Sequence, residues 1–290
     1  MRCYQHAAPG TLEVRAHSVT EFLQWLGPQA TPGGLRSLNA EQVEQFFLTE
    51  AQKKGRAGRR SMQSALRTFF RFCLHQGHIL QPLDRAVPTL RTYKLATVPR
   101  GLTDEQAQRT LLATNRQTPV GRRDFAILQL LYTYGVRGGQ VRALRLEDID
   151  WRQNQLLFRA AKHGKDVRLP LTLEVGESLL DYLRHARPAC SCPEVFLTCR
   201  APYHALPNAN SLSALVKHRL QAAGIELPGR GAAHAFRHGF ATRMLQQGQT
   251  LKAIADVLGH RHLGTTFLYT KVDFKALKQV ALEWPQEVPE

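Results

Sequence analysis

Apolar residues recur at intervals of three and four along most of this chain, a spacing that is typical of amphipathic helices. In the first third of the chain, the predicted helices span 18–27, 39–51 and 61–77. Asn39 is expected to cap the second helix. The inward face of the third helix is predicted to carry Leu66, Phe69, Phe70 and Cys73. Residues before His17 show no periodicity and are predicted to be irregular, and the basic run 52–60 is predicted to be a connector.

The pattern is interrupted over 82–101, where prolines and spaced Lys and Arg residues indicate an extended linker. Helical spacing then returns, and the predicted helices span 102–114, 123–134, 172–186, 210–224, 250–259 and 272–284. Thr103 and Gln106 fit a capping box at the start of the first of these helices. Gly135 is expected to end the second in a left-handed conformation, and Asn210 or Ser211 to cap the fourth.

Strict alternation of apolar and polar residues marks 156–160 and 167–171, on either side of a turn at 163–164. This pattern predicts a β-hairpin, and 193–199 is a candidate for one more short strand. The fold class is therefore mainly α with a small antiparallel β-sheet. We predict a helical domain over 1–90, a linker over 91–101 and a mixed α+β domain over 102–290.

The charge of the chain indicates the class of its partner. Lys and Arg number 39 against 23 Asp and Glu, a formal net charge of +16. Such an excess suits a polyanion, and nucleic acid is favoured over a membrane surface because no segment is long and apolar enough to span a bilayer. The first residues lack the apolar core of a secretory signal, so a cytoplasmic location is expected. The candidates for phosphate contact, which also fit a solvated face, are Lys53, Lys54, Arg56, Arg59 and Arg60.

Cysteines do not predict a disulfide framework, because their number, five, is odd. Cys190, Cys192 and Cys199 precede His204, a set that could bind zinc. The C-x-C spacing is not that of a common zinc ribbon, so incidental reduced thiols are the favoured interpretation. No metal and no cofactor are expected.

The stretch 234–269 concentrates groups that suit chemistry on a phosphodiester. Arg237 offers a guanidinium fork that matches phosphate oxygens, and His234 and His260 can exchange or donate a proton near neutral pH. The phenol of Tyr269 can become a nucleophile when neighbouring cations favour its deprotonation. Taken singly, each of these residues also fits a packed or solvated side chain.

Two more basic groups come from other parts of the chain. Arg137 follows the predicted helix end, beside two glycines that let the backbone approach a ligand closely. Lys162 and Lys165 flank the hairpin turn, so either amine could reach a site below that turn. A solvated glycine turn and a solvated hairpin tip are the simpler interpretations of these residues.

Together these segments resemble the tyrosine recombinases of the phage-integrase family. YGVRGGQVRALRLEDID resembles the family's box around its first catalytic arginine, and HAFRHGFATRML resembles its H-x-L-R-H box. LGHRHLGTTFLYTKVD resembles the box that ends in the nucleophilic tyrosine, and AKHGKDVRLPL the hairpin with the catalytic lysine. ALRTFFRFCLHQGHI is similar to the end of the family's helical core-binding domain. The resemblance implies a SAM-like core-binding domain over 1–90 and a catalytic domain over 102–290.

The resemblance also implies a mechanism. Tyr269 would attack the scissile phosphate of double-stranded DNA to give a 3′-phosphotyrosyl link, while Arg137 and Arg237 hold the phosphate oxygens. Lys162, or Lys165 if the hairpin register differs, would protonate the leaving 5′-oxygen. His234 would help to move the tyrosine proton. His260 would hydrogen-bond the phosphate. No metal or ATP is implied, and the enzyme would act as a homotetramer on DNA through its C-terminal segment.

Three positions depart from the family pattern. Gln140 stands where an acidic residue is frequent, Phe236 where Leu is usual and Gly239 where Thr is usual. The Gln140 departure leaves open how Arg137 is held.

The alternatives are a type IB-like topoisomerase, a catalytically silent DNA-binding protein and a metal-dependent transposase or nuclease. The last would use Glu147, Asp148 and Asp150, which more simply mark the turn into the sheet.

Overall fold

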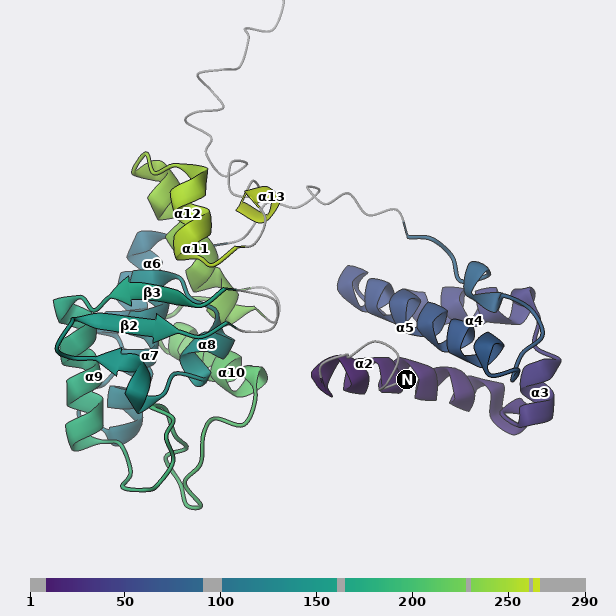
Figure 1. Ribbon diagram of the computed structural model, residues 1–290, viewed down its shortest axis with the longest axis horizontal. Helices are drawn as coiled ribbons and strands as arrows, with labels where there is room; N and C mark the ends of the chain where they lie inside the picture. Colours follow the sequence, from purple (N-terminus) through teal and green to yellow (C-terminus); the bar gives the residue numbers. More distant parts are fainter. Residues whose placement is uncertain (1–8, 91–100, 161–164, 228–230, 261–262, 267–290) are drawn as a thin grey trace, which may run out of the picture. The chain divides into compact units, whose positions relative to one another are not determined.

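The structure is a computed structural model that describes residues 9–90, 101–160, 165–227, 231–260 and 263–266. It divides into two compact units, Met1–Lys94 and Leu95–Glu290 (Figure 1). Within the described residues, no helix is long and apolar enough to cross a membrane.

The first unit is entirely helical where it is described. Its elements are α2 (Pro9–Leu26), η1 (Gly27–Gln29), α3 (Pro32–Arg36), α4 (Ala40–Gln52), α5 (Arg56–His75) and η2 (Leu83–Arg85). Aromatic rings fill its core: Phe22 meets the edges of Phe46 and Phe70 at centroid distances of 5.1 and 5.3 Å. Asn39 caps α4 in a capping box, as expected. In the predicted inward face of α5, Leu66, Phe70 and Cys73 are buried, and Phe69 packs against the same core.

Three predictions for this unit are wrong. The first part of the predicted linker, 82–90, contains η2 and packs on the helical core, where Leu83 and Val87 are buried. The chain before His17 is helical, because α2 begins at Pro9. No described residue before Ser18 is buried, so this part of the helix has no apolar stripe that periodicity could detect. The basic run is helical from Arg56 onward. There Arg59 Nε donates to the carbonyls of Ala51 and Lys54 at 2.6 and 2.8 Å, which joins the start of α5 to the end of α4.

The second unit combines helices with one small sheet, as the fold class predicted. Its elements are α6 (Asp104–Leu112), α7 (Pro119–Tyr134), α8 (Gly138–Arg142), η3 (Leu146–Asp148), β1 (Ile149–Asp150), β2 (Gln155–Phe158), β3 (Val167–Pro170), α9 (Leu173–His185), α10 (Ala209–Ala222), α11 (Ala232–Gln246), α12 (Leu251–Val257) and α13 (Leu263–Thr266). The strands lie in the order β1-β2-β3, all antiparallel, with Leu156 opposite Leu169 and Phe158 opposite Val167. The predicted helix 272–284 lies outside the described residues.

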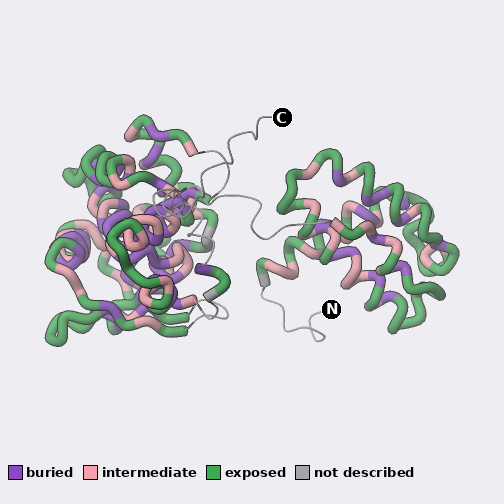
Figure 2. The backbone as a smooth tube through the Cα atoms, turned by 90° about the horizontal axis from the view of Figure 1, so that it is seen from above, coloured by how far each residue is buried: buried purple, intermediate pink, exposed green. Residues whose placement is uncertain are grey.

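The central element of this unit is α7, which packs against α9 and α11 (Figure 1). Burial along α7 alternates little, because neighbouring elements cover most of its circumference. Buried and exposed residues of the described chain are distinguished in Figure 2. Gly135 ends it with φ of +58°, the left-handed conformation expected there. Just before that end, the Tyr134 hydroxyl donates to the Pro170 carbonyl at 2.6 Å and joins α7 to β3.

Two smaller predictions for this unit are wrong. Residues 193–199 form no strand and only two isolated bridges, Arg145 with Glu194 and Leu197 with Ala205. Leu146 N donates to Pro193 O and Val195 N to Leu144 O, so this backbone pairs with a bent segment that supports no longer ladder. The cap of α10 is Asn208, whose Oδ1 accepts from Ser211 N at 2.9 Å; the two predicted caps lie inside the first turn.

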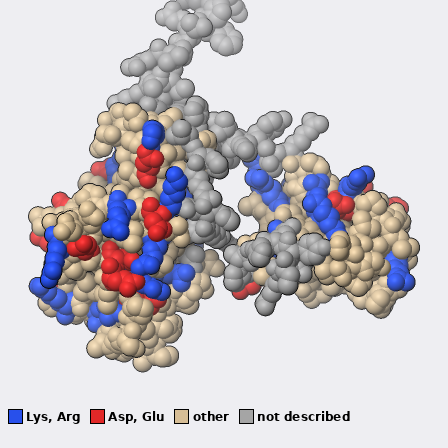
Figure 3. Space-filling view, in the orientation of Figure 1, with Lys and Arg blue, Asp and Glu red and all other residues tan. Residues whose placement is uncertain are grey.

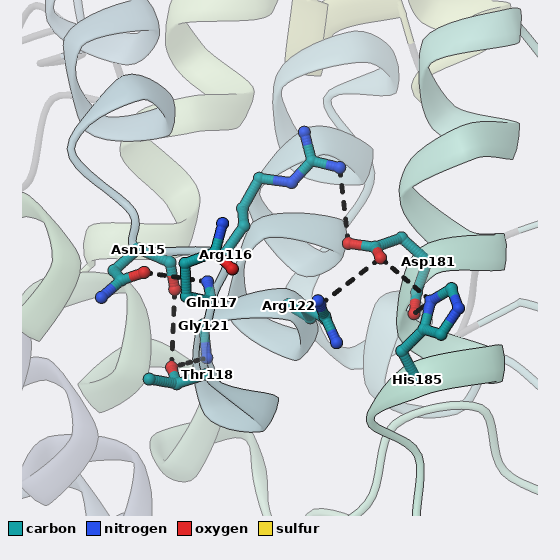
Figure 4. A network of polar contacts seen from close by, with 8 residues as sticks. All are labelled: Asn115, Arg116, Gln117, Thr118, Gly121, Arg122, Asp181 and His185. Carbon is teal, nitrogen blue, oxygen red and sulfur yellow. Dashed lines mark hydrogen bonds and ion pairs between the residues drawn. The ribbon is translucent and has the colours of Figure 1, made fainter.

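Polar contacts fix the connection between α6 and α7. Asp181 on α9 pairs with Arg116 and Arg122 at 3.4 Å and with His185 at 3.2 Å (Figure 4). Lys and Arg side chains are interleaved with Asp and Glu on the face of the second unit seen in Figure 3. The Asp181 ion pairs are partly exposed and each contributes little to stability, but together they tie the α6–α7 loop and the start of α7 to α9.

The described chain enters the second unit by crossing α11 backbone to backbone. Leu102 N donates to Ala235 O at 3.1 Å. A Cβ on Gly101 would come within 2.6 Å of Gly239 N, and a Cβ on Gly239 would overlap Leu102 O. Glycine at both positions therefore allows this close approach.

Candidate active site

Arg237 is the buried centre of the candidate site. It lies in the middle of α11 with 3% of its surface exposed. Its Nη1 donates to Gly135 O at 2.9 Å, and its Nη2 donates to Leu258 O at 2.8 Å. Gly135 and Leu258 are the C-caps of α7 and α12, whose terminal carbonyls lack intrahelical partners. The guanidinium thus joins two helix ends and is held in one orientation by them.

His260 lies beside this guanidinium. It follows Gly259, whose φ of +62° turns the chain after α12. Its Nε2 lies 2.7 Å from Arg237 Nη2, and its Nδ1 lies 2.7 Å from Thr266 Oγ1. A guanidinium only donates, so Nε2 accepts and Nδ1 carries the proton in a neutral ring. Burial, followed by the charges of Arg237 and Arg137, lowers the pKa of His260 to about 4.

Arg137 is the N-cap residue of α8, directly after the end of α7. Its backbone N–H donates to Gln140 Oε1 at 3.1 Å, and Gln140 Nε2 donates to Arg159 O at 3.3 Å. Gln140 therefore holds the Arg137 turn through the main chain and joins it to the end of β2. Among the described residues, no hydrogen bond or ion pair is formed by the Arg137 guanidinium.

Two histidines on α11 complete the cluster. The rings of His234 and His238, one turn apart, have centroids 6.3 Å apart. Partial burial, then Arg237 and Arg137, lower the pKa of His234 below its ordinary value. Burial, then His234 and Arg237, lower the pKa of His238 to about 4. No carboxylate among the described residues contributes to these shifts, so the site gathers cationic and neutral donors that suit an anion.

The turn end of the β2–β3 hairpin lies next to this cluster. On one side, the Arg159 carbonyl accepts from Gln140. On the other, a Cβ on Gly259 would lie 3.0 Å from Val167 Cγ2 and 3.5 Å from Lys165 O. Lys165 is exposed, and Lys162 lies outside the described residues.

The remaining candidate, Tyr269, also lies outside the described residues, three positions beyond the end of α13. The structure thus brings together Arg137 from the start of α8, His234 and Arg237 from α11, and His260 from the turn after α12. Sequence reasoning missed Thr266 and the main-chain role of Gln140. Only a hydroxyl shortly after His260 and a polar residue in an apolar stretch could have signalled them.

The predicted phosphate contacts of the first unit have different surroundings. Lys53 pairs with Glu50 at 2.7 Å while staying exposed, and Lys54 pairs with Glu21 at 2.6 Å with 20% of its side chain exposed. Arg59 uses its Nε within the unit. Arg56 and Arg60 are exposed within the first two turns of α5. These last two are the residues of the set most accessible to a phosphate.

The acidic and thiol alternatives have structural explanations. Arg159 binds Glu147 and Asp148 at 2.7 and 2.8 Å, and Asp150 Oδ1 accepts from two backbone N–H groups in the next turn. Among the described residues, no group of three His, Cys, Asp or Glu is arranged to hold a metal. Cys190, Cys192 and Cys199 are free thiols.

Residues 100–276 match the model of the phage integrase family. The putative integrase/recombinase y4rA of Sinorhizobium fredii (strain NBRC 101917 / NGR234) is 38% identical over 253 residues, which cover 87% of this chain and 61% of that protein's length. Tyrosine recombinase XerD of Xanthomonas axonopodis pv. citri (strain 306) is 31% identical over 285 residues, which cover 95% of this chain and 91% of that one.

Solved structures show the same fold. A lambda integrase (75–356) dimer bound to a COC′ core site matches with a TM-score of 0.71 and 16% identity, over 99% of this chain and 95% of that one. A lambda integrase tetramer bound to a Holliday junction matches with a TM-score of 0.61 and 16% identity, over 78% of this chain and 65% of that one.

Proposed function

Because the chain belongs to the phage integrase family, we propose that it is a site-specific tyrosine recombinase, which cuts and rejoins DNA strands through a 3′-phosphotyrosyl intermediate. The observation that carries this proposal is the cluster of Arg137, His234, Arg237 and His260, which offers donors to one anion. Of the two segments that lead to the undescribed candidates, α13 contacts His260 through Thr266, and the turn end of the hairpin lies beside Gln140 and Gly259, close neighbours of the cluster.

In the proposed reaction, Tyr269 attacks the scissile phosphorus and the 5′-oxygen leaves. Arg137 and Arg237 bind the non-bridging oxygens, on which negative charge builds as the phosphorus becomes pentavalent. Preorganised donors of this kind contribute about 3 kcal/mol each to a transition state. Arg237 is already fixed by two carbonyls, so its side chain needs little reorganisation when the phosphate arrives.

The two imidazoles differ in their surroundings. The lowered pKa keeps His234 neutral near pH 7, and a neutral imidazole can accept the phenol proton of Tyr269. His260 would contact the phosphate beside Arg237, whose Nη2 already meets its Nε2. A bound phosphate would raise the pKa of both rings, because its negative charge offsets the nearby arginines.

A covalent adduct is the direct test of this chemistry. The full chain is incubated with sheared DNA from its source cell, quenched in detergent and digested with nuclease and protease. We expect mass spectrometry to find a nucleotide on the peptide that contains Tyr269, and no adduct with Tyr269→Phe. An adduct that persists in the Phe variant, or its absence from the wild type, would overturn the proposal. The recovered DNA also supplies the target sequence for later assays.

Lys162 is the proposed general acid for the 5′-oxygen. A duplex with sulfur at the bridging 5′ position needs no such acid, because a thiolate is a better leaving group than an alkoxide. Lys162→Ala is therefore expected to cleave the oxygen substrate about a hundredfold more slowly than the wild type, but to cleave the sulfur substrate at about the wild-type rate. If Lys165→Ala, the matched control, shows this recovery instead, Lys165 is the acid.

The partner we propose is double-stranded DNA with a specific recombination site, bound by a homotetramer through the C-terminal segment. The lambda integrase tetramer on a Holliday junction supports this assembly. We assign core binding to 1–90 and catalysis to 102–290, with the linker 91–101 between them. Phosphate contact is assigned to Arg56 and Arg60 first. The expected setting is the cytoplasm and a mobile element whose DNA is integrated or excised, as the relatives named integrase suggest.

A further inference from the structure

We propose that Thr266 is a positioning residue that acts on Arg237 through His260. Its hydroxyl fixes the proton of His260 on Nδ1, which leaves Nε2 free to accept from the arginine. The inference rests on the proposed function, because it assigns the device to the phosphate-binding arginine. It concerns described residues only and does not depend on where Tyr269 lies.

The geometry is a chain of short polar contacts. Thr266 Oγ1 lies 2.7 Å from His260 Nδ1, and His260 Nε2 lies 2.7 Å from Arg237 Nη2. The same Nη2 donates to Leu258 O at 2.8 Å. Thr266 has 0% and Arg237 3% of its surface exposed, so water does not compete at either end.

The direction of these hydrogen bonds follows from the donor inventory. A guanidinium has no acceptor, so the neutral His260 ring must accept through Nε2 and donate through Nδ1. The other tautomer would place an N–H of His260 against an N–H of Arg237. Arg237 disfavours this arrangement, and Thr266 reinforces the preference by giving the Nδ1 proton a buried acceptor. Without the hydroxyl, the tautomer that accepts from Arg237 leaves a buried N–H without this partner and loses part of its advantage.

The charges around His260 favour the same neutral ring. Arg237 and His238 face it from α11, and Arg137 faces it from the start of α8. On α12, Lys252 and Asp256 pair with each other at 3.1 Å on the exposed side. The described part of the hairpin contributes the backbone of Lys165 beside Gly259. These cations favour the neutral ring. Arg237 and Thr266 together set its tautomer, because Arg237 needs an acceptor at Nε2 and the Thr266 hydroxyl can accept the Nδ1 proton.

The placement of Thr266 gives this contact a further consequence. It lies in α13, three residues before Tyr269. The contact of Arg237 with His260 therefore depends on a residue of α13, the helix that precedes the proposed nucleophile in the chain.

The first test needs no DNA. Imidazole ¹⁵N shifts, recorded on the full ¹⁵N-histidine-labelled chain and assigned with His260→Gln, distinguish the two tautomers. We expect the Nδ1–H form in the wild type and in Thr266→Ser, which keeps the hydroxyl, and a mixed or Nε2–H population in Thr266→Val. Thr265→Val changes the exposed neighbouring threonine and is the matched control. An unchanged His260 tautomer in Thr266→Val would overturn the inference.

The second test measures cleavage of a nicked duplex built on the recovered target. Loss of one buried hydrogen bond corresponds to a decrease of about tenfold in the cleavage rate of Thr266→Val, with Thr266→Ser and Thr265→Val within about twofold of wild type. Equal rates for Thr266→Val and wild type, or no recovery in Thr266→Ser, would also overturn it. If the wild type forms no adduct, the proposed function fails, and the tautomer measurement still decides the role of Thr266.

Discussion

Replacing Gln140 tests whether the Arg137 turn and the hairpin are coupled through one buried amide. Gln140→Met keeps the length of the side chain but removes its acceptor for Arg137 N and its donor for Arg159 O, bonds of 3.1 and 3.3 Å at a position 3% exposed. Each bond contributes about 1 kcal/mol, so we expect a loss of about 2 kcal/mol in the free energy of unfolding. For a unit of this size, that loss corresponds to a fall of about 6 °C in Tm.

Gln140→Glu separates the two contacts. The carboxylate still accepts from Arg137 N but cannot donate to Arg159 O, so about 1 kcal/mol or more should be lost. Calorimetry gives the stability, and the nicked duplex gives the cleavage rate, which we expect to fall about tenfold in the Met variant because the Arg137 turn is less constrained. Gln153→Met, in an exposed turn, is the control. If Gln140→Met is within 0.5 kcal/mol of this control, roughly the scatter of surface substitutions, the coupling argument is wrong.

Three more outcomes can be measured. Gly239→Ala should lower the free energy of unfolding by about 2 kcal/mol, because its Cβ would overlap the Leu102 backbone. The control Gly176→Ala, whose Cβ would make only ordinary contacts in α9, should leave the free energy of unfolding unchanged or raise it slightly. Equal effects of the two substitutions would contradict the close approach of Gly239 to Leu102. Because the folded pKa of His238 and His260 is about 4 and that of an unfolded histidine about 6.5, the unfolded chain binds more protons between these values. The free energy of unfolding should be at its full value above about pH 6.5 and fall by roughly 3 kcal/mol toward pH 4, after discounting for solvent screening. Denaturant unfolding at a series of pH values and constant salt measures this; a free energy of unfolding that does not change with pH would refute the lowered pKa values. Arg60→Gln should reduce the slope of log K for DNA against log salt by about 1, and an unchanged slope would remove Arg60 from the phosphate contacts.

Most elements could be predicted from the sequence because their signals are local. The Asn39 and Thr103 caps and the left-handed Gly135 depend on backbone chemistry within a few residues, and the hairpin depends on strict alternation. The first turns of α2 were not predicted, because they are exposed and carry no apolar stripe. The strand predicted over 193–199 was wrong, because an apolar run does not reveal whether its backbone will pair with a strand or with a bent segment.

The candidate site divides in the same way. Residue types and spacing nominated Arg137, Arg237 and His260, but not the contacts between them. That Arg237 would cap two helices depends on Gly135 and Leu258, 102 and 21 residues away in the chain. Such distant pairings arise from tertiary packing, which no window of neighbouring residues contains.

The crossing of Gly101 over Gly239 bears on how chimeras could be assembled from this member of the phage integrase family. A graft that joins a foreign core-binding domain after residue 101 would risk introducing a bulky side chain where only hydrogen fits, one position from His238 and two from Arg237. A junction placed earlier, so that Gly101 and Leu102 stay joined to the proposed catalytic domain, preserves the fit. The place where the two domains can be exchanged is therefore limited by the absence of side chains at Gly101 and Gly239.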